Sequence, residues 1–249
     1  MYLENFRLED RIIQYNVIKS KRKTIELSIN DKKEIVIKAP INCSNEYINK
    51  FLKDKQKWIT ERLDVIEKRL SSRVYLEFKT GERLLYLGKS YPLVVEYDKG
   101  NRIGAGFDKG EFRLVLPHYL EGEPRKEAAK KIIIDLYKKM AKSLLKERTE
   151  FYSKLIGVTV NRVFIKGQKT LWGSCSSKNN INYNWKLIMA PLEVLDYVVV
   201  HELCHIIHRN HSNAYWQEVE KYMPDYKKRI KWLKEYGFSL QLEWQPYEM

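Results

Sequence analysis

The chain has 249 residues, of which 46 are Lys or Arg and 32 are Asp or Glu, so its formal net charge is +14. This length permits one large domain or two small ones, and the 44% of apolar residues exclude a disordered polyelectrolyte. No apolar run reaches the roughly 18 residues of a membrane-spanning helix. Met1–Asp10 lacks the apolar core of a secretory signal, and three scattered cysteines favour a reducing interior, so we expect a cytoplasmic protein.

The first half of the chain reads mostly as short strands. β-Branched runs separated by polar or glycine-containing breaks predict the strands, and apolar residues at helical spacing predict one long helix among them. The predicted elements are strands at Ile12–Ile18, Thr24–Ile29 and Glu34–Ala39, a helix at Ser44–Leu70, and strands at Val74–Phe78, Arg83–Tyr86, Tyr91–Tyr97 and Phe112–Leu116.

The second half mixes long helices with a small β-rich stretch. A helix begins near Pro124 and runs to about Tyr152, and a buried helix begins near Pro191. Between them we predict strands at Val158–Lys166, Leu171–Ser176 and Asn180–Asn184, and after them helices at Asn213–Tyr222 and Pro224–Tyr236. The order predicts an α+β fold, with a mostly β N-terminal portion at 1–120 and a second domain at 121–249.

Four of the five histidines fall between positions 201 and 211. His201-Glu202-Leu203-Cys204-His205 matches the pattern H-E-x-x-H of zinc hydrolases. Residues i and i+4 lie one turn apart on the same helix face, so both imidazoles can reach one metal ion. Glu202 is offset around the helix, where it can reach water beside the metal without binding the metal itself. We therefore expect Zn²⁺ as the cofactor and Glu202 as the catalytic residue.

A catalytic zinc site needs a third protein ligand. We expect His211, because it follows the second motif histidine by six residues, the interval found in extended zinc motifs of this type. His208 shares the helical stripe and Glu218 lies on the next helix, so both remain alternatives. Cys175 and Cys204 are weaker candidates. A glycine occupies the position of His208 in the extended motif, so the turn here cannot rely on glycine.

These motifs resemble those of the YgjP-like metal-dependent hydrolases, which are zincin-like metallopeptidase domains. The residues that carry the resemblance are Trp172-Gly173-Ser174-Cys175-Ser176, Asn182, Leu187, Pro191, Asp196–His205, Asn210-His211-Ser212, Trp216, Pro224-Asp225 and Trp232-Leu233, with Trp58-Ile59 and Gly88–Leu93 in the first half. The resemblance implies a zincin-like domain over 121–249 with zinc held by His201, His205 and His211. It implies Glu202 as the catalytic residue.

Further roles follow from this interpretation. Zincin enzymes pair an extended substrate with an edge strand above the metal, and Leu171–Ser176 is the candidate for that strand. Metal-bound histidines usually donate their second nitrogen to a carboxylate or a carbonyl, for which Asp225 and Glu218 are candidates. We expect a metallopeptidase in which Glu202 takes the proton of water activated by zinc.

Two alternatives differ in the partner. The same site could release pyrophosphate from a nucleoside triphosphate such as UTP, with basic side chains neutralising the phosphates. Alternatively, the basic segment Lys19–Lys23 and the Lys-rich predicted helix point to a nucleic-acid-associated zinc protein. Acidic residues interleave with those lysines, which favours an ordinary solvated surface. We expect a polypeptide or nucleotide substrate, consider nucleic acid less favoured, and expect no membrane partner.

Overall fold

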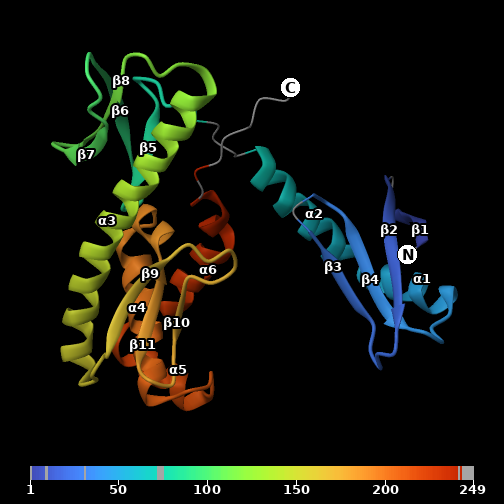
Figure 1. The fold of residues 1–249 in the computed structure, drawn as a ribbon. Helices are drawn as coiled ribbons and strands as arrows, with labels where there is room; N and C mark the ends of the chain where they lie inside the picture. The colour runs from blue at the N-terminus through green and yellow to red at the C-terminus, as the bar shows by residue number, and fades with distance from the viewer. Residues whose placement is uncertain (1, 9–10, 31, 72–75, 241, 243–249) are drawn as a thin grey trace. The chain divides into compact units, whose positions relative to one another are not determined.

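The computed structural model describes residues 2–8, 11–30, 32–71, 76–240 and 242. The chain divides into two compact units, Met1–Arg73 and Val74–Met249 (Figure 1). Each unit combines helices with mixed β-sheet, which confirms the predicted α+β class. Among the described residues, every helix is too short or too polar to cross a bilayer.

The first unit packs two helices on one face of a four-stranded sheet. The strands lie in the order β1-β2-β4-β3, with β2 and β4 parallel. Inward-facing residues of the sheet, among them Tyr15 and Ile37, share a core with Ile48, Leu52 and Ile59 of the helices. The elements are β1 (Tyr2–Leu8), β2 (Arg11–Ser20), β3 (Glu26–Ile29), β4 (Ile35–Pro40), α1 (Asn45–Asp54) and α2 (Gln56–Ser71).

Two features of this unit differ from the sequence prediction. Strand β1 was not predicted, and the single helix predicted over Ser44–Leu70 is broken into α1 and α2 at Lys55. At Lys55 the backbone has φ −99° and ψ 6°, outside the α-helical values. The helical pattern of backbone hydrogen bonds still includes this residue: the Ile59 amide donates to the Lys55 carbonyl at 2.9 Å. The break redirects the chain while Leu52 and Ile59 both remain fully buried.

The second unit is organised around one long helix, α3 (Gly122–Ile156). Its first half covers a mixed sheet of strand order β5-β6-β8-β7, and its second half packs against the helix at Leu192–Ile207 and the strand at Arg162–Lys166. The helix ends at Gly157, whose φ of 78° is the left-handed conformation typical of helix ends. The strands are β5 (Arg83–Tyr86), β6 (Lys89–Asp98), β7 (Gly104–Asp108) and β8 (Glu111–Pro117). Strand β7 was not predicted.

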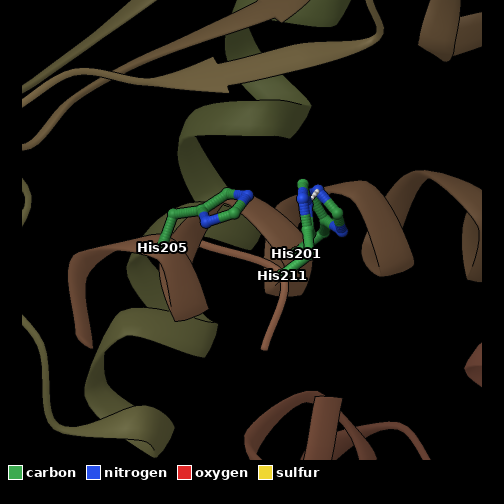
Figure 2. Close-up of side chains that lie close together, drawn as sticks. All are labelled: His201, His205 and His211. Carbon is green, nitrogen blue, oxygen red and sulfur yellow. Dashed lines mark hydrogen bonds between the residues drawn. The ribbon is translucent and has the colours of Figure 1, made fainter. Parts of the chain in front are cut away.

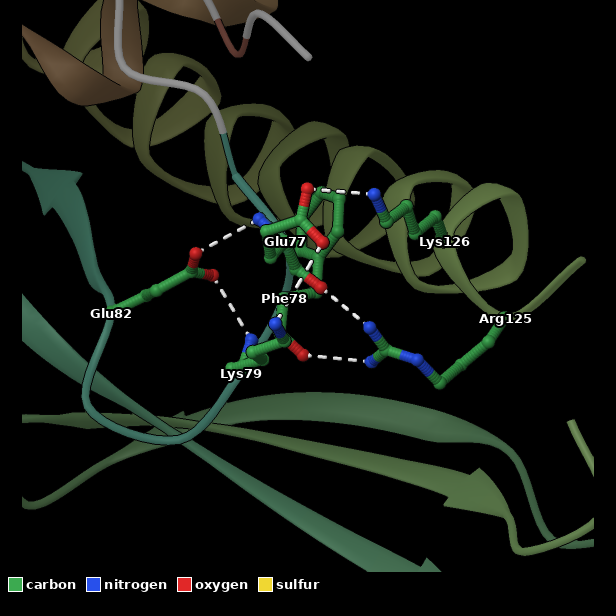
Figure 3. Close-up of polar contacts among 6 residues, drawn as sticks. All are labelled: Glu77, Phe78, Lys79, Glu82, Arg125 and Lys126. Carbon is green, nitrogen blue, oxygen red and sulfur yellow. Dashed lines mark hydrogen bonds and ion pairs between the residues drawn. The ribbon is translucent and has the colours of Figure 1, made fainter. Parts of the chain in front are cut away.

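The backbone of Glu77–Lys79, in the segment before β5, is held by side chains of α3 and by Glu82 (Figure 3). Arg125 donates to the carbonyls of Phe78 at 3.0 Å and Glu77 at 2.7 Å, and Lys126 lies 2.6 Å from the Glu77 carboxylate. The Glu82 carboxylate accepts the amides of Glu77 and Lys79. These contacts satisfy the backbone groups that a strand would use, so the strand predicted at Val74–Phe78 is wrong for Leu76–Phe78, and its first two residues lie outside the described residues.

The division between the units differs from the predicted one at 120/121. Strands β5 to β8 belong with the second unit because their core residues pack on α3. Phe112 and Tyr137 lie 5.6 Å apart between ring centroids, and the Tyr137 hydroxyl donates to the carbonyl of Leu85 at 2.7 Å. A break at 120/121 would expose this shared core.

The remaining elements surround a central helix, α4 (Leu192–Ile207). Residues Val194–Val200 of α4 are buried without interruption, so this stretch of the helix is enclosed on all sides. The other elements are β9 (Arg162–Lys166), β10 (Gly173–Cys175), β11 (Asn180–Asn184), the 3₁₀ helix η1 (Trp185–Met189), α5 (Asn213–Tyr222), α6 (Tyr226–Tyr236) and the 3₁₀ helix η2 (Gly237–Ser239). The strands form a small mixed sheet of order β10-β11-β9.

Asp196 anchors α4 to α3 through a partly buried ion pair. Arg148 donates from Nε and Nη2 to the two carboxylate oxygens of Asp196, each at 2.7 Å, and the Tyr152 hydroxyl adds a third bond at 3.2 Å. A bidentate pair of this kind fixes direction as well as distance. It holds α4 at a position five residues before His201.

The turn between β5 and β6 supplies a second, glycine-dependent anchor. Gly88 has φ 76°, and a β-carbon there would lie 2.9–3.1 Å from atoms of Pro191, the residue before α4. Gly81 also has a positive φ, of 98°, but a β-carbon there would meet nothing within 4 Å. We therefore expect Gly88→Ala to lower the free energy of unfolding by about 1–3 kcal/mol more than Gly81→Ala, because only Gly88 adds a steric clash to the backbone strain. Urea unfolding of both variants tests this, and equal losses would show that the contact with Pro191 is loose.

Candidate metal centre

Three histidine side chains converge at the end of α4. His201 and His205 come from successive turns of α4, and His211 comes from the loop that leads to α5. Figure 2 shows the His205 ring facing the adjacent rings of His201 and His211. The candidate ligand nitrogens all lie within 4.8 Å of one another, and the Nε2 atoms of His201 and His211 are 3.3 Å apart.

Second hydrogen-bonding partners orient two of these rings. The Nδ1 atom of His205 lies 3.1 Å from the carbonyl of His208, and that of His201 lies 3.3 Å from the Tyr197 hydroxyl. A carbonyl can only accept, so the His205 proton sits on Nδ1 and its Nε2 lone pair faces the other imidazoles. These partners differ from the two predicted carboxylates. Tyr197 precedes His201 by four residues, the same helical interval that separates His201 from His205. This spacing could have predicted Tyr197 as a partner of His201, but the sequence analysis did not use it.

The two carboxylates that we expected in that role bind cations elsewhere. Asp225 accepts from Arg229 at 2.6 Å, and Glu218 lies 2.5 Å from the ammonium group of Lys221. The alternative ligand Glu218 is therefore engaged in an ion pair on α5. Within the described part of the chain, His201, His205 and His211 are the group of potential ligands close enough to share one ion.

Two aromatic residues of α5 pack against the histidine rings. The Tyr215 ring stacks on His205 with centroids 4.6 Å apart, and its hydroxyl donates to the carbonyl of His201 at 3.1 Å. The ring of Trp216 stacks on His211 at 5.6 Å. Tyr215 is fully buried, so its ring cannot leave without opening a cavity beneath the histidines.

The loop that brings His211 back does not need glycine. His208 ends α4 with φ −124° and ψ 112°, an extended conformation that any residue adopts. The His208 amide still donates to the carbonyl of Cys204 at 2.9 Å, and Ser212 caps α5 by accepting the amide of Tyr215. The absence of the motif glycine at this position is therefore without consequence for the backbone.

Glu202 is a buried carboxylate directly beneath the edge strand. It is 4% exposed, and burial raises its pKa from 4.5 to about 8. Gly173 of β10 lies against it so closely that a β-carbon there would be 2.5 Å from the carboxylate oxygen Oε1. The chain thus leaves room for this carboxylate by having no side chain at position 173. The sequence analysis gave Gly173 no role of its own.

Burial also acts on the imidazoles. It lowers the pKa of His201 to about 3, with further lowering from His205 and His211, and it lowers the pKa of His205. Both rings are therefore neutral at pH 7, and the neutral imidazole is the form that binds a metal.

Strand β10 forms the open edge of the small sheet. The Asn184 amide donates to the carbonyl of Trp172, and the Ser176 amide donates to the carbonyl of Asn180. The backbone groups of Trp172 and Ser176, which flank β10, therefore point toward β11. Successive residues of an antiparallel strand alternate in this respect. The backbone groups of Gly173 and Cys175 therefore point away from β11, toward the free edge.

The two candidate cysteine ligands lie outside the group. Cys204 is fully buried on α4, and Cys175 lies on β10 with its sulfur 3.6 Å from Arg209.

The sequence matches the family model described as YgjP-like, metallopeptidase domain, over residues 23–236. The chain belongs to this family. Its membership supports a metal-dependent hydrolase with a polypeptide substrate, and it implies a divalent metal.

Comparison with solved structures gives partial likenesses. The metallopeptidase zymogen abylysin of Pyrococcus abyssi is 23% identical with a TM-score of 0.34, over 36% of this chain and 92% of that one. The zymogen jannalysin of Methanocaldococcus jannaschii is 21% identical with a TM-score of 0.31, over 35% and 93%. No curated protein matches the sequence.

The raised pKa of Glu202 predicts a pH-dependent stability in the metal-free protein. The folded state favours the protonated carboxyl, so its contribution is fully present below about pH 4.5 and is lost as the pH rises through about 8. We expect Glu202→Gln to become more stable than the wild type by a few kcal/mol between pH 5 and pH 9, at about 1.4 kcal/mol per pKa unit. The lowered pKa of His201 acts equally in both proteins.

Urea unfolding in the presence of a chelator measures this difference. Glu220→Gln is the control, because Glu220 is an exposed carboxylate on α5. It should follow the wild type at every pH. If the stability difference between Glu202→Gln and the wild type stays constant from pH 5 to pH 9, the pKa of Glu202 is not raised by burial.

Proposed function

We propose that this chain is a zinc-dependent peptidase with a zincin-like domain in its second unit. The observation that carries the proposal is the convergence of three imidazoles within 4.8 Å beside the buried Glu202. Three nitrogen donors leave one tetrahedral position open, the arrangement typical of catalytic zinc. Family membership independently supports a metal-dependent peptidase.

The donor set fits zinc. His201, His205 and His211 would hold the ion, with Tyr197 and the His208 carbonyl orienting the first two rings. When bound, zinc supplies a Lewis acid that lowers the pKa of water and polarises a carbonyl.

Glu202 supplies the proton transfers. It follows the first histidine on α4, and its carboxylate lies against Gly173 of β10. As general base it takes a proton from water that attacks the peptide carbonyl, and as general acid it returns that proton to the leaving amine. Glu202 acts as a base in its carboxylate form, which a dication held by the three imidazoles would favour.

The free edge of β10 supplies a binding mode for an extended peptide. The outward amides and carbonyls of Gly173 and Cys175 can pair with a substrate backbone. Pairing of this kind places a peptide bond over Glu202 without selecting for sequence. We propose this edge as the substrate strand.

No observation favours the two alternative functions. Basic and acidic side chains number 17 and 11 in Met1–Arg73 and 29 and 21 in Val74–Met249, so the excess is shared by both units. The polar contacts of the three imidazoles described above are to the Tyr197 hydroxyl, the His208 carbonyl and one another. The three cysteines are unpaired, which supports a reducing compartment, and we propose the cytoplasm.

The ligand assignment predicts different effects for neighbouring histidines. We expect His211→Ala to weaken binding of Co²⁺, a spectroscopic substitute for zinc, by at least about 100-fold, since even outer partners of ligands contribute ~10–100-fold. His208→Ala should bind as the wild type does, because only its backbone carbonyl contacts His205. Titration followed by visible absorption measures both. The reverse ranking would make His208 the third ligand.

The mechanism predicts that Glu202→Gln retains Co²⁺ and Zn²⁺ and loses cleavage of unstructured peptides by at least ~10²-fold, because no proton acceptor remains. Glu218→Gln, on α5, should keep activity. Mass spectrometry of a peptide mixture incubated with the zinc-loaded proteins measures cleavage. Equal activity in wild type and Glu202→Gln contradicts this mechanism, and a parallel assay of pyrophosphate release from UTP tests the nucleotide alternative.

A further inference from the structure

Arg209 joins the loop that carries His211 to the hairpin between β10 and β11. From its place after α4, its Nη1 atom donates to the carbonyl of Ser176 at 2.8 Å and lies 3.6 Å from the sulfur of Cys175. Its Nη2 atom donates to the side-chain carbonyl of Asn179 at 2.5 Å. One guanidinium therefore contacts both the end of the edge strand and the hairpin that follows it.

The hairpin itself is firmly held. Asn179 has φ 55°, and its amide donates to the carbonyl of Ser176 at 3.0 Å, which closes the turn. Asn161 donates its amide to the Asn179 carbonyl at 3.0 Å, so the turn is also tied to the chain entering β9. A side chain bound to this turn is thus bound to the sheet as a whole.

The loop that carries Arg209 is also constrained, by its contacts with the histidine cluster. Arg209 follows directly after His208, whose carbonyl accepts from His205, and precedes His211 by two residues. A shift of the loop at Arg209 would move both the group that orients His205 and the residue that we propose as third ligand.

Two contacts therefore locate β10 above the site, one at each end. Gly173 rests on Glu202 at the first residue of the strand, and Arg209 holds Cys175 and Ser176 at the other end. The partners of Arg209 are a carbonyl, an amide and a thiol, all uncharged, so its role here is geometric and not charge neutralisation.

We propose that Arg209 is a positioning residue that sets the distance and register between the edge strand and the metal loop. This inference rests on the proposed peptidase function, in which a substrate pairs with the edge of β10. Arg209 acts through the hairpin, without contacting the substrate. Near-attack geometry is sensitive to displacements of about 1 Å, so loosening this link reduces turnover while the metal stays bound.

A double-mutant cycle between Arg209 and Asn179 tests the proposal. Asn179→Gly removes the acceptor while glycine still adopts the positive φ, and Arg209→Gln replaces the guanidinium with a shorter, neutral amide. We expect each variant to lower kcat/KM by about 10-fold or more, and the double variant to lose less than the two single losses combined, because both changes remove the bond between Arg209 and Asn179. Lys178→Gln, which removes a charge from the exposed tip of the same hairpin, should match the wild type.

Two further readouts separate positioning from other roles. Amide hydrogen exchange across 173–180 should accelerate in Arg209→Gln and Asn179→Gly, while the visible spectrum of bound Co²⁺ stays unchanged. Each peptide is assayed with a neutral and with an acidic residue near the scissile bond. A loss confined to acidic peptides, additive losses in the double variant, or unchanged exchange would overturn the proposal, the first by making Arg209 a substrate contact.

The exchange measurement also separates this inference from the function on which it rests. If zinc-loaded wild type cleaves no peptide, the proposed function fails. The exchange rates of Arg209→Gln still decide whether Arg209 holds the edge strand: faster exchange across 173–180 supports the link, and wild-type rates contradict it.

Discussion

The enclosure of α4 is the constraint on which the site depends. Val194–Val200 are buried without a break, so this helix cannot rotate or slide without exposing apolar surface. The bidentate pair of Arg148 with Asp196 adds a directional anchor. The imidazoles of His201 and His205 therefore leave α4 in fixed directions, and the remaining parts of the site are built around them: α5 beneath, β10 above, and the following loop beside.

Local periodicity accounts for what the sequence could predict. The interval of four residues is enough to place His201 and His205 on one helix face, and the structure places His211 beside them. What could not be predicted depends on contacts between distant segments. Arg125 replaces a strand partner for the segment before β5, and the Arg209 link spans about thirty residues of sequence. Patterns of hydrophobicity do not record such pairings, because the side chains involved are polar and partly exposed.

The net charge of +14 belongs to the whole chain. The basic excess is spread across both units, and many of the cations pair with nearby carboxylates, as Lys221 does with Glu218. Surface pairs of this kind contribute little to stability and mainly keep the surface hydrated. Arg209 is an instructive exception, because its contacts are to neutral acceptors beside the histidines. The arrangement of one cation is more informative here than the total.

Gly173 shows that a position can matter through the atoms it lacks. It has no group that could bind, donate or accept beyond its backbone, yet a single added methyl would occupy the space of the Glu202 carboxylate. A substitution scan of this chain would therefore rank Gly173 with residues that carry chemistry, and a search for reactive side chains would pass over it. Whether a substitution is tolerated near this site therefore depends on the space left for the Glu202 carboxylate as well as on which side chains react.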